Sequence, residues 1–302
     1  MAFNNVTILG VGLIGASLAL ALKEGKLCNS ILGFGRNEDN LRRAQSRGII
    51  DEYRMDAASA VELADLVVLA TPVGTFRELI EAVRPGLRTG AAMLDVGSVK
   101  GTLVYDLETL MPEGVAYIGT HPIAGGDRSG IEDARADLFR YARCIVTPTE
   151  NSDTDALRKV AMLWEAVGSR VEFMDPFKHD ELYAAVSHLP HLLAYALVNT
   201  VGDFDDGAMQ YAGQGFRDTT RIALSSPELW RDISILNREN ILRVLGILRI
   251  NLDRIEVLLK AGDQAGLDRE LGKAQQLRMQ LLGKPRQGSQ EPGNSMSADQ
   301  GL

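Results

Sequence analysis

The chain reads Gly10-Val11-Gly12-Leu13-Ile14-Gly15 between an apolar stretch, residues 6–9, and a helix-like run, residues 16–23. This is the strand–turn–helix context that a dinucleotide fingerprint requires. Gly10 would allow the tight turn, Gly12 the approach of a pyrophosphate to the backbone, and Gly15 the close packing of the helix on the strand. The stretch therefore predicts a cofactor site formed by Gly10, Gly12, Leu13, Ile14 and Gly15. A plain strand-to-helix corner is the alternative.

The residues after a second predicted strand, 30–34, bear on the choice of cofactor. Domains that bind NAD usually carry an acid about 20 residues beyond the fingerprint, where it holds the ribose 2′-hydroxyl. Here that place holds Gly35, and Arg36 follows it. Because an arginine pairs with a 2′-phosphate, the sequence favours NADP. NAD held through backbone contacts is the alternative.

Strands alternate with helices up to about residue 174. Further strands are predicted at 64–70, 91–95, 115–119, 143–148 and 170–174, and helices at 13–24, 38–46, 76–84, 102–111 and 154–167. This alternation predicts an α/β domain of the Rossmann type with a doubly wound parallel sheet. Ligands bind beyond the carboxyl ends of the strands in such sheets. Thr71, Ser98 and His121 follow three of the predicted strands, so we expect them at the ligand edge, with Thr71 and Ser98 near the cofactor.

From residue 175 onward the pattern is helical only, with predicted helices at 177–187, 190–201, 227–259 and 263–282. We therefore expect a dinucleotide-binding domain over 1–174, an all-helical substrate and dimerisation domain over 175–283, and a disordered polar tail over 284–302. Apolar residues recur at helical spacing over 227–260, which would span about 50 Å if unbroken. So long an apolar stripe predicts an intertwined homodimer. A break near residues 237–240, giving two helices of one core, is the alternative.

Composition excludes several classes of function. The 302 residues carry a formal net charge of −8, which argues against nucleic acid as a partner. No apolar run reaches the ~18 residues that span a membrane, and the first strand begins too early for a signal peptide ahead of it. The two cysteines, Cys28 and Cys144, fit no ligand or redox spacing. They predict reduced thiols and a cytoplasmic location.

The four histidines are the candidates for acid–base chemistry. A neutral imidazole at His121, at the ligand edge, can accept a proton near neutral pH, and Ser98 could hydrogen-bond its other ring nitrogen. A structural histidine is the alternative. His188 and His191, three apart, can share a helix face. Metal binding there would need a third ligand, which the spacing does not offer. His179 lies in a charged run and is expected to be solvated.

Two arginines, Arg217 and Arg221, lie four apart in Gly215-Phe216-Arg217-Asp218-Thr219-Thr220-Arg221. On one side of a helix they could clamp a carboxylate of the substrate. The alternative is that they are surface residues paired with Asp218 or Asp232.

These stretches together resemble the prephenate/arogenate (cyclohexadienyl) dehydrogenase family. The resemblance covers nearly all the chain up to the tail, and the matching stretches are residues 10–15, Asp-Val-Gly-Ser-Val-Lys at 95–100, Thr-His-Pro-Ile-Ala-Gly at 120–125, Ser-His-Leu-Pro-His at 187–191, residues 215–221 and Leu-Trp-Arg-Asp at 229–232.

The resemblance implies oxidative decarboxylation of prephenate or arogenate, to 4-hydroxyphenylpyruvate or tyrosine, with hydride transfer to NAD(P) and no metal. It implies that His121 accepts the hydroxyl proton, that Ser98 orients His121, and that Arg221 binds the ring carboxylate. His191 would contact the substrate from the helical domain, with His188 and Arg217 as further candidates. The site would lie in the cleft between the domains, where His121 and Arg221 meet.

Two departures and two rival functions stay open. Gly35 and Arg36 replace the acid of many NAD-using relatives, and Gly126 stands where some relatives carry larger polar residues, which bears on whether a pyruvyl or an alanyl side chain is accepted. A β-hydroxyacid dehydrogenase is one rival, but it needs a catalytic lysine, for which only Lys178 is near. A non-catalytic NADP(H)-binding regulator is the other rival.

Overall fold

An eight-stranded sheet organises the first half of the computed structural model, which describes residues 3–125 and 130–283. The strands lie in the order β3-β2-β1-β4-β5-β6-β7-β8. Their bounds are β1 Asn5–Leu9, β2 Ser30–Phe34, β3 Glu52–Arg54, β4 Leu66–Leu69, β5 Ala92–Asp95, β6 Ala116–Pro122, β7 Arg143–Thr147 and β8 Arg170–Phe173. Neighbouring strands are parallel except at one place, so the predicted α/β fold class is confirmed.

The exception is β7, which runs antiparallel to β6 and pairs His121 with Ile145. A parallel return needs a crossover, usually a helix. The described part of the connection from β6 to β7 contains only a 3-10 turn, Ile131–Asp133, so the chain turns back alongside β6. The predicted parallel pairing therefore holds for the other strand pairs and fails only between β6 and β7. The short edge strand β3 was not predicted, and β6 extends three residues further than expected.

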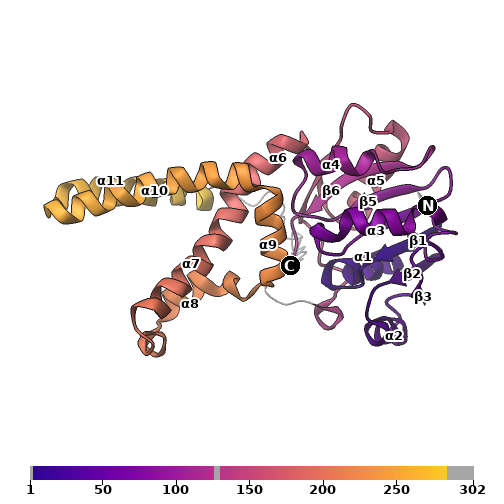
Figure 1. Ribbon diagram of the computed structural model, residues 1–302, viewed down its shortest axis with the longest axis horizontal. Coiled ribbons are helices and arrows are strands. Elements are labelled where there is room, and N and C mark those ends of the chain that lie inside the picture. The colour runs from indigo at the N-terminus through magenta and orange to yellow at the C-terminus, as the bar shows by residue number, and fades with distance from the viewer. Residues whose placement is uncertain (1–2, 126–129, 284–302) are drawn as a thin grey trace, which may run out of the picture. The chain divides into compact units, whose positions relative to one another are not determined.

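The strands place alternate residues on two faces, as the period of two in a strand requires. In β4, Leu66 and Val68 join one apolar core while Val67 and Leu69 join the other. The first core packs against α1, α2 and α5, and the second against α3 and α4 (Figure 1). These helices are α1 Leu13–Glu24, α2 Glu38–Ser46, α3 Phe76–Val83, α4 Gly101–Glu108 and α5 Thr154–Ala166. Burial on both faces explains why the central strands β1, β4 and β5 read as almost continuous apolar runs, unlike the exposed edge strands β3 and β8.

The remainder of the described chain is helical. Its elements are α6 Pro176–Tyr183, a π-helical turn Ala184–His188, α7 Leu189–Phe204, α8 Gln214–Thr220, α9 Pro227–Leu236, α10 Arg238–Ala261 and α11 Gln264–Gly283. By contacts between residues the chain forms two compact units, Met1–Leu245 and Gly246–Leu302. Helices α6 to α9 therefore share a unit with the sheet. The domain boundary at residue 174 stays a prediction from the sequence pattern.

The single helix predicted over 227–259 is not observed, because the chain breaks at Asn237 between α9 and α10. The Asn237 side chain is buried and donates Nδ2–H to the carbonyl oxygen of Asp180, 2.8 Å away, and to Nδ1 of His188, 3.1 Å away. These two contacts hold the junction inside the first unit. The alternative of two helices is the one that the structure supports at this position.

In the second unit, α11 and the part of α10 after residue 245 form a helical hairpin through Gly262, whose φ of +64° suits glycine. Arg254 and Glu270 form an ion pair of 3.0 Å across it. No helix among the described residues is long and apolar enough to cross a membrane. The predicted disorder of residues 284–302 and the interpretation of Gly126 lie outside the described residues.

Candidate active site

The glycine-rich turn between β1 and α1 has the geometry of a phosphate-binding turn. Gly10 has a φ of +104°, and a Cβ there would lie 2.7 Å from the carbonyl carbon of Ala70. A Cβ at Gly15 would lie 2.3 Å from the carbonyl oxygen of Gly10. A Cβ at Gly12 would meet nothing within 4 Å. The protein's own packing thus requires glycine at 10 and 15, while Gly12 leaves open space that a pyrophosphate can use.

A cavity of about 570 Å³ opens beside this turn, at the carboxyl ends of β1, β2 and β4. Its lining includes Gly10, Gly12, Arg36 and Thr71. Leu13 and Ile14 lie half-buried in the first turn of α1. They directly follow Gly12, which lines the cavity, but they are not part of the lining themselves. The residues present therefore fit a dinucleotide with its phosphates at the α1 N-terminus.

At the carboxyl end of β2, where the chain lines this cavity, Gly35 has room for a side chain. A Cβ there would meet only Leu41, at the ordinary distance of 3.7 Å. Packing thus does not exclude an acid at position 35. Arg36 is exposed, and within the described residues it forms no ion pair, whereas Arg43 on the same wall pairs with Glu132 at 3.2 Å. Arg36 is accordingly the cation in the lining whose charge no carboxylate offsets through an ion pair.

His121 lies inside β6, one residue before its end, and only 8% of it is exposed. Its Nδ1 lies 2.8 Å from Nε2 of His179 on α6. The expected hydrogen bond from Ser98 to His121 is absent between these two described residues, and Ser98 is half-buried in the loop before α4. The expectation that His179 is solvated was also wrong, because its exposed fraction is 0%. His179 is therefore the residue that orients His121 in this structure.

Burial favours the neutral form of His121 and of His179. Loss of hydration lowers the pKa of His121 well below its usual value, and the neighbouring His179, Lys100 and His188 lower it further. Burial also lowers the pKa of His179, although the adjacent Asp180 opposes this shift. A neutral His121 near pH 7 can accept a proton, as a general base must.

Two buried charged residues support the strand ends beneath His121. Lys100 Nζ pairs with Asp95 Oδ1 at 2.5 Å, and both side chains are almost wholly buried. Tyr117 donates its hydroxyl to Asp95 Oδ2 at 2.6 Å, and burial followed by the charge of Asp95 raises the pKa of Tyr117 well above its usual value. These roles were not predicted from the sequence. The stretch 95–100 did contain Asp95 and Lys100, five residues apart, as a signal.

His188 and His191 have different environments. His188 has an exposed fraction of 0%, its Nδ1 accepts from Asn237, and burial lowers its pKa to about 4. In this structure it lies in the packed interior beside the candidate site, where its charge would act on His121. His191 stacks on Trp230 with ring centroids 3.6 Å apart, and its Nδ1 donates to the carbonyl oxygen of Ser187 at 2.9 Å. No group of three His, Cys, Asp or Glu side chains suited to a metal ion occurs in the described chain.

The two arginines lie at and after the end of α8, where Arg217 is exposed and Arg221 begins a 3-10 turn. The acids expected to compete for them have other partners, since Asp218 accepts from Gln214 and Asp232 pairs with Arg231.

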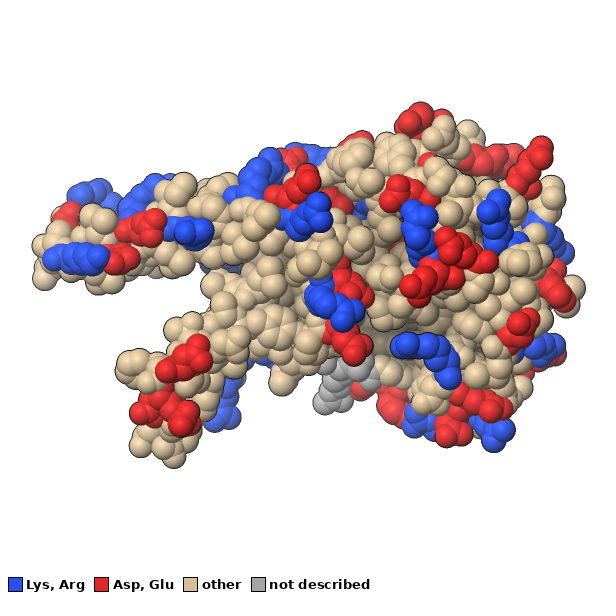
Figure 2. All heavy atoms as spheres, viewed as in Figure 1, with Lys and Arg blue, Asp and Glu red and all other residues tan. Residues whose placement is uncertain are grey.

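Figure 2 shows acidic and basic side chains interspersed on the face in view. Convergence of Arg221 and His121 on one ligand stays a prediction.

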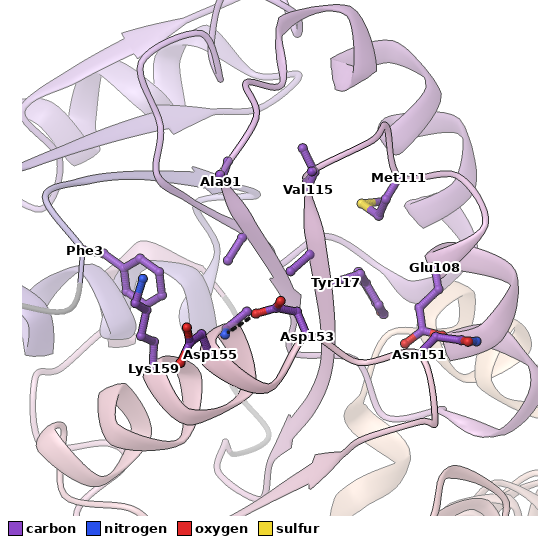
Figure 3. Close-up of a pocket in the computed structure, with 15 residues that line it drawn as sticks. Phe3, Ala91, Glu108, Met111, Val115, Tyr117, Asn151, Asp153, Asp155 and Lys159 are labelled. Carbon is purple, nitrogen blue, oxygen red and sulfur yellow. Dashed lines mark hydrogen bonds between the residues drawn. The ribbon is translucent and has the colours of Figure 1, made fainter.

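A second cavity, of about 330 Å³, lies at the opposite edge of the sheet, where β5 and β6 begin (Figure 3). Its acids already serve the fold, because Glu108 accepts from Thr149, Asp153 caps α5, and Asp155 pairs with Arg158. Parallel sheets bind ligands at their carboxyl edge. The edge that carries the glycine turn and His121 is therefore the candidate ligand site.

Two family models match successive parts of the chain. Residues 18–173 match the family described as "Prephenate dehydrogenase, nucleotide-binding domain", and residues 175–273 match "Prephenate dehydrogenase, dimerization domain". A cyclohexadienyl dehydrogenase of Zymomonas mobilis is 31% identical, over 92% of this chain and 96% of that protein.

Two solved structures are also similar. The prephenate dehydrogenase of Aquifex aeolicus, in complex with hydroxyphenyl propionate and NAD+, is 37% identical with a TM-score of 0.87, over 92% of this chain and 98% of that one. The arogenate dehydrogenase of Synechocystis is 30% identical with a TM-score of 0.76, over 92% of this chain and 99% of that one.

Proposed function

The chain belongs to the prephenate dehydrogenase family, and from this premise we propose that it oxidatively decarboxylates prephenate, arogenate or both in tyrosine biosynthesis. The observation that carries the proposal is a neutral, oriented imidazole, His121, at the sheet edge that holds the dinucleotide turn. A Cβ on Gly125, four residues after His121, would lie 4.0 Å from Ile14 in that turn. This approach links the end of β6 to the cofactor end of the site.

The bound nicotinamide nucleotide supplies one thing, a hydride acceptor. His121 Nε2 accepts the proton of the ring hydroxyl as hydride leaves the carbon that bears it, so that this carbon becomes a carbonyl. The ring then loses its carboxylate as CO2, and the electron pair of the broken bond completes an aromatic ring. The oxygen regains its proton from His121 and becomes a phenol. Aromatisation makes the reaction downhill, so a weak, neutral base suffices.

The substrate is held by residues of the helical segment. Arg221, with Arg217 nearby, binds the ring carboxylate, since a guanidinium matches a carboxylate through two parallel hydrogen bonds. His191 contacts the substrate side chain from its stack on Trp230. Ser98 contacts the substrate hydroxyl or the nicotinamide from the loop between β5 and α4. His188 is fully buried, so it does not contact the substrate. It supports the site through its hydrogen bond with Asn237.

The cofactor is NADP in preference to NAD. Arg36 in the cavity lining supports this choice, and so does position 35, which has room for an acid but carries a glycine. The Aquifex aeolicus relative is described with NAD+, so NAD is the alternative. We further propose a homodimer through α10 and α11, which the match to a dimerization domain supports. The cytoplasmic location remains a prediction from cysteine usage.

A two-by-two assay tests the function. Purified protein is incubated with prephenate or arogenate and with NAD or NADP, while reduced nicotinamide is followed by absorbance. Turnover of at least one substrate is expected, with NADP favoured. The His121→Asn variant should lose about 10²–10⁴-fold in kcat while binding cofactor normally, as loss of a general base predicts.

Absence of turnover with both substrates would contradict the proposal. Cofactor binding without turnover would favour a regulator. Turnover of a β-hydroxyacid would favour the other rival, which needs a catalytic lysine. Lys178 does not suit that role, because it is exposed and pairs with Glu181 at 2.7 Å.

A further inference from the structure

A chain of hydrogen bonds extends from His121 into the protein interior. His121 Nδ1 lies 2.8 Å from His179 Nε2, and His179 Nδ1 lies 2.8 Å from Asp180 Oδ1. The backbone N–H of Lys100 donates to the same Oδ1 at 2.8 Å. His179, Asp180 and Lys100 are at most 3% exposed, whereas His121 keeps an exposed fraction of 8%. His121 is therefore the member that can meet a ligand.

Which ring nitrogens carry a proton can be worked out from Asp180, the last acceptor in this series of hydrogen bonds. A backbone N–H can only donate, so Asp180 Oδ1 accepts from Lys100 and, as a carboxylate, also accepts from His179 Nδ1–H. In a neutral His179 ring, Nε2 then carries the lone pair. His121 must donate to it through Nδ1–H. The lone pair of His121 is left on Nε2, the nitrogen that a base at this position would use.

We propose that His179 and Asp180 are positioning residues for His121 and that His179 holds the proton during the reaction. This inference rests on the proposed function. The substrate O–H bond breaks and an Nε2–H bond forms on His121. At the same time the Nδ1–H bond of His121 breaks and an Nε2–H bond forms on His179. His121 stays neutral in its other tautomer, and an imidazolium on His179 faces the Asp180 carboxylate. The proton returns by the same route to the product oxygen.

The charges around the two rings favour this location of the proton. Asp180 raises the pKa of His179, whereas the groups that accompany burial at His121, namely His179, Lys100 and His188, all lower the pKa of His121. Lys100 and Asp95 also face His179, and Asp95 pairs with Lys100. A cation is thus better accommodated on the ring next to Asp180.

Neighbouring residues hold His121, His179 and Asp180, together called the relay, in fixed orientations. Tyr183, one turn after His179 on α6, stacks on its ring at 4.4 Å and lies 4.9 Å from the His121 ring. Asn237 Nδ2 donates to the backbone carbonyl of Asp180, so the start of α10 is tied to the same residue. Tyr183 therefore fixes the planes of the two imidazole rings, and the Lys100 N–H fixes the carboxylate of Asp180.

The first test reads the protons directly in the full-length protein, without substrate. Long-range ¹H–¹⁵N spectra of imidazole-labelled protein at pH 7.5 should show His121, His179 and His191 protonated on Nδ1 and His188 protonated on Nε2. With four histidines in the chain, single histidine-to-glutamine variants assign each signal. A His179 or His121 protonated on Nε2 in the free enzyme would overturn the relay, and this result is independent of any activity.

The second test is the pH profile of Asp180→Asn, which keeps an oxygen for the Lys100 N–H but removes the charge. We expect kcat to fall about 100-fold and the acidic limb of kcat/KM to move to lower pH by about one unit, because an opposite charge within contact distance shifts a pKa by one to three units. Unchanged cofactor binding, measured by NADPH fluorescence, would show that the variant is folded.

The matched control is Glu181→Gln on the next residue of α6, which removes the same charge from a half-buried acid paired with Lys178 and Arg243. Its pH profile should match the wild type. His179→Gln, whose amide oxygen can accept from His121 Nδ1–H but cannot store a proton, should also lose about 100-fold in kcat. An unshifted acidic limb in Asp180→Asn, or wild-type kcat in His179→Gln, would overturn the proposal. If neither substrate is turned over by wild-type protein, the proposed function fails, while the tautomer pattern still decides the relay.

Discussion

At the scale of single residues, the histidines differ in role because they differ in hydrogen-bond partners. His121 keeps its Nε2 lone pair for chemistry, His179 links it to Asp180, and His188 closes a buried contact with Asn237. The sequence indicated His121 because it follows a predicted strand at the ligand edge. It could not indicate His179, because the contact joins residues 58 positions apart and depends on how α6 packs. The adjacent Asp180 was the only local hint.

The cofactor prediction also belongs to single residues. Gly35→Asp should raise the KM for NADP by tenfold or more and lower the preference for NADP, because a carboxylate repels a 2′-phosphate and can hold a 2′-hydroxyl. Arg36→Ala should raise the KM for NADP by about tenfold with little change for NAD, the loss expected for one charge-assisted hydrogen bond. Initial rates with each cofactor measure both effects.

Arg42→Ala is the control for these variants. Arg42 lies on α2, the helix that begins two residues after Arg36, but it pairs with Glu38 at 2.9 Å and does not line the cavity. It should leave the ratio of NADP to NAD activity unchanged. An Arg36→Ala enzyme with the wild-type ratio would show that the 2′-phosphate is read elsewhere or that NAD is the natural cofactor.

At the scale of elements, helix periodicity predicted the right residues but not where the helix ends. The stretch 227–259 keeps its apolar spacing across Asn237, so nothing local required a break there. The break arises because Asn237 satisfies the Asp180 carbonyl and His188, which are distant in sequence. The same reasoning applies to β7, whose direction depends on the connection and not on its own residues.

The exposed apolar residues of α10 carry the prediction about assembly. Ile247, Ile250 and Val257 are each more than half exposed in the single chain, at spacings that share one helix face. Ile250→Asp should weaken the dimer on the order of 100-fold, because burying one isoleucine stabilises by about 1.5 kcal/mol or more and a two-fold interface contains it twice. Light scattering across a dilution series measures the dissociation constant.

Asn251→Asp is the matched control, since it adds the same charge at the next, also exposed, residue of α10. It should leave the dimer intact. Equal dissociation constants for the two variants would place the interface away from this face of α10.

At the scale of the whole molecule, the histidines make stability depend on pH. All four belong to the candidate site, and burial lowers the pKa of three, His121, His179 and His188. An unfolded histidine has a pKa near 6.5, so below that pH the unfolded state binds protons that the native state does not. Stability is therefore complete above pH 6.5 and declines as the pH falls toward the native pKa values.

For His188, whose native pKa is about 4, the loss at pH 5 is about 2 kcal/mol. Urea unfolding at pH 7.5, 6 and 5, at one protein concentration, should show the free energy of unfolding falling by at least this amount. His188→Gln, if folded, should show a shallower decline. A free energy of unfolding that is constant over this range would contradict neutral, buried histidines.

The sequence alone determined the glycine turn, the alternation of strands and helices, the helical second half and the position of His121 at the ligand edge. These features are local, because backbone sterics at glycine and the periods of 2 and 3.6 act between near neighbours. Only the tertiary structure decided the antiparallel β7, the break at Asn237 and the pairing of His121 with His179. Each of these depends on contacts between segments far apart in the chain, whose energies the local pattern does not contain.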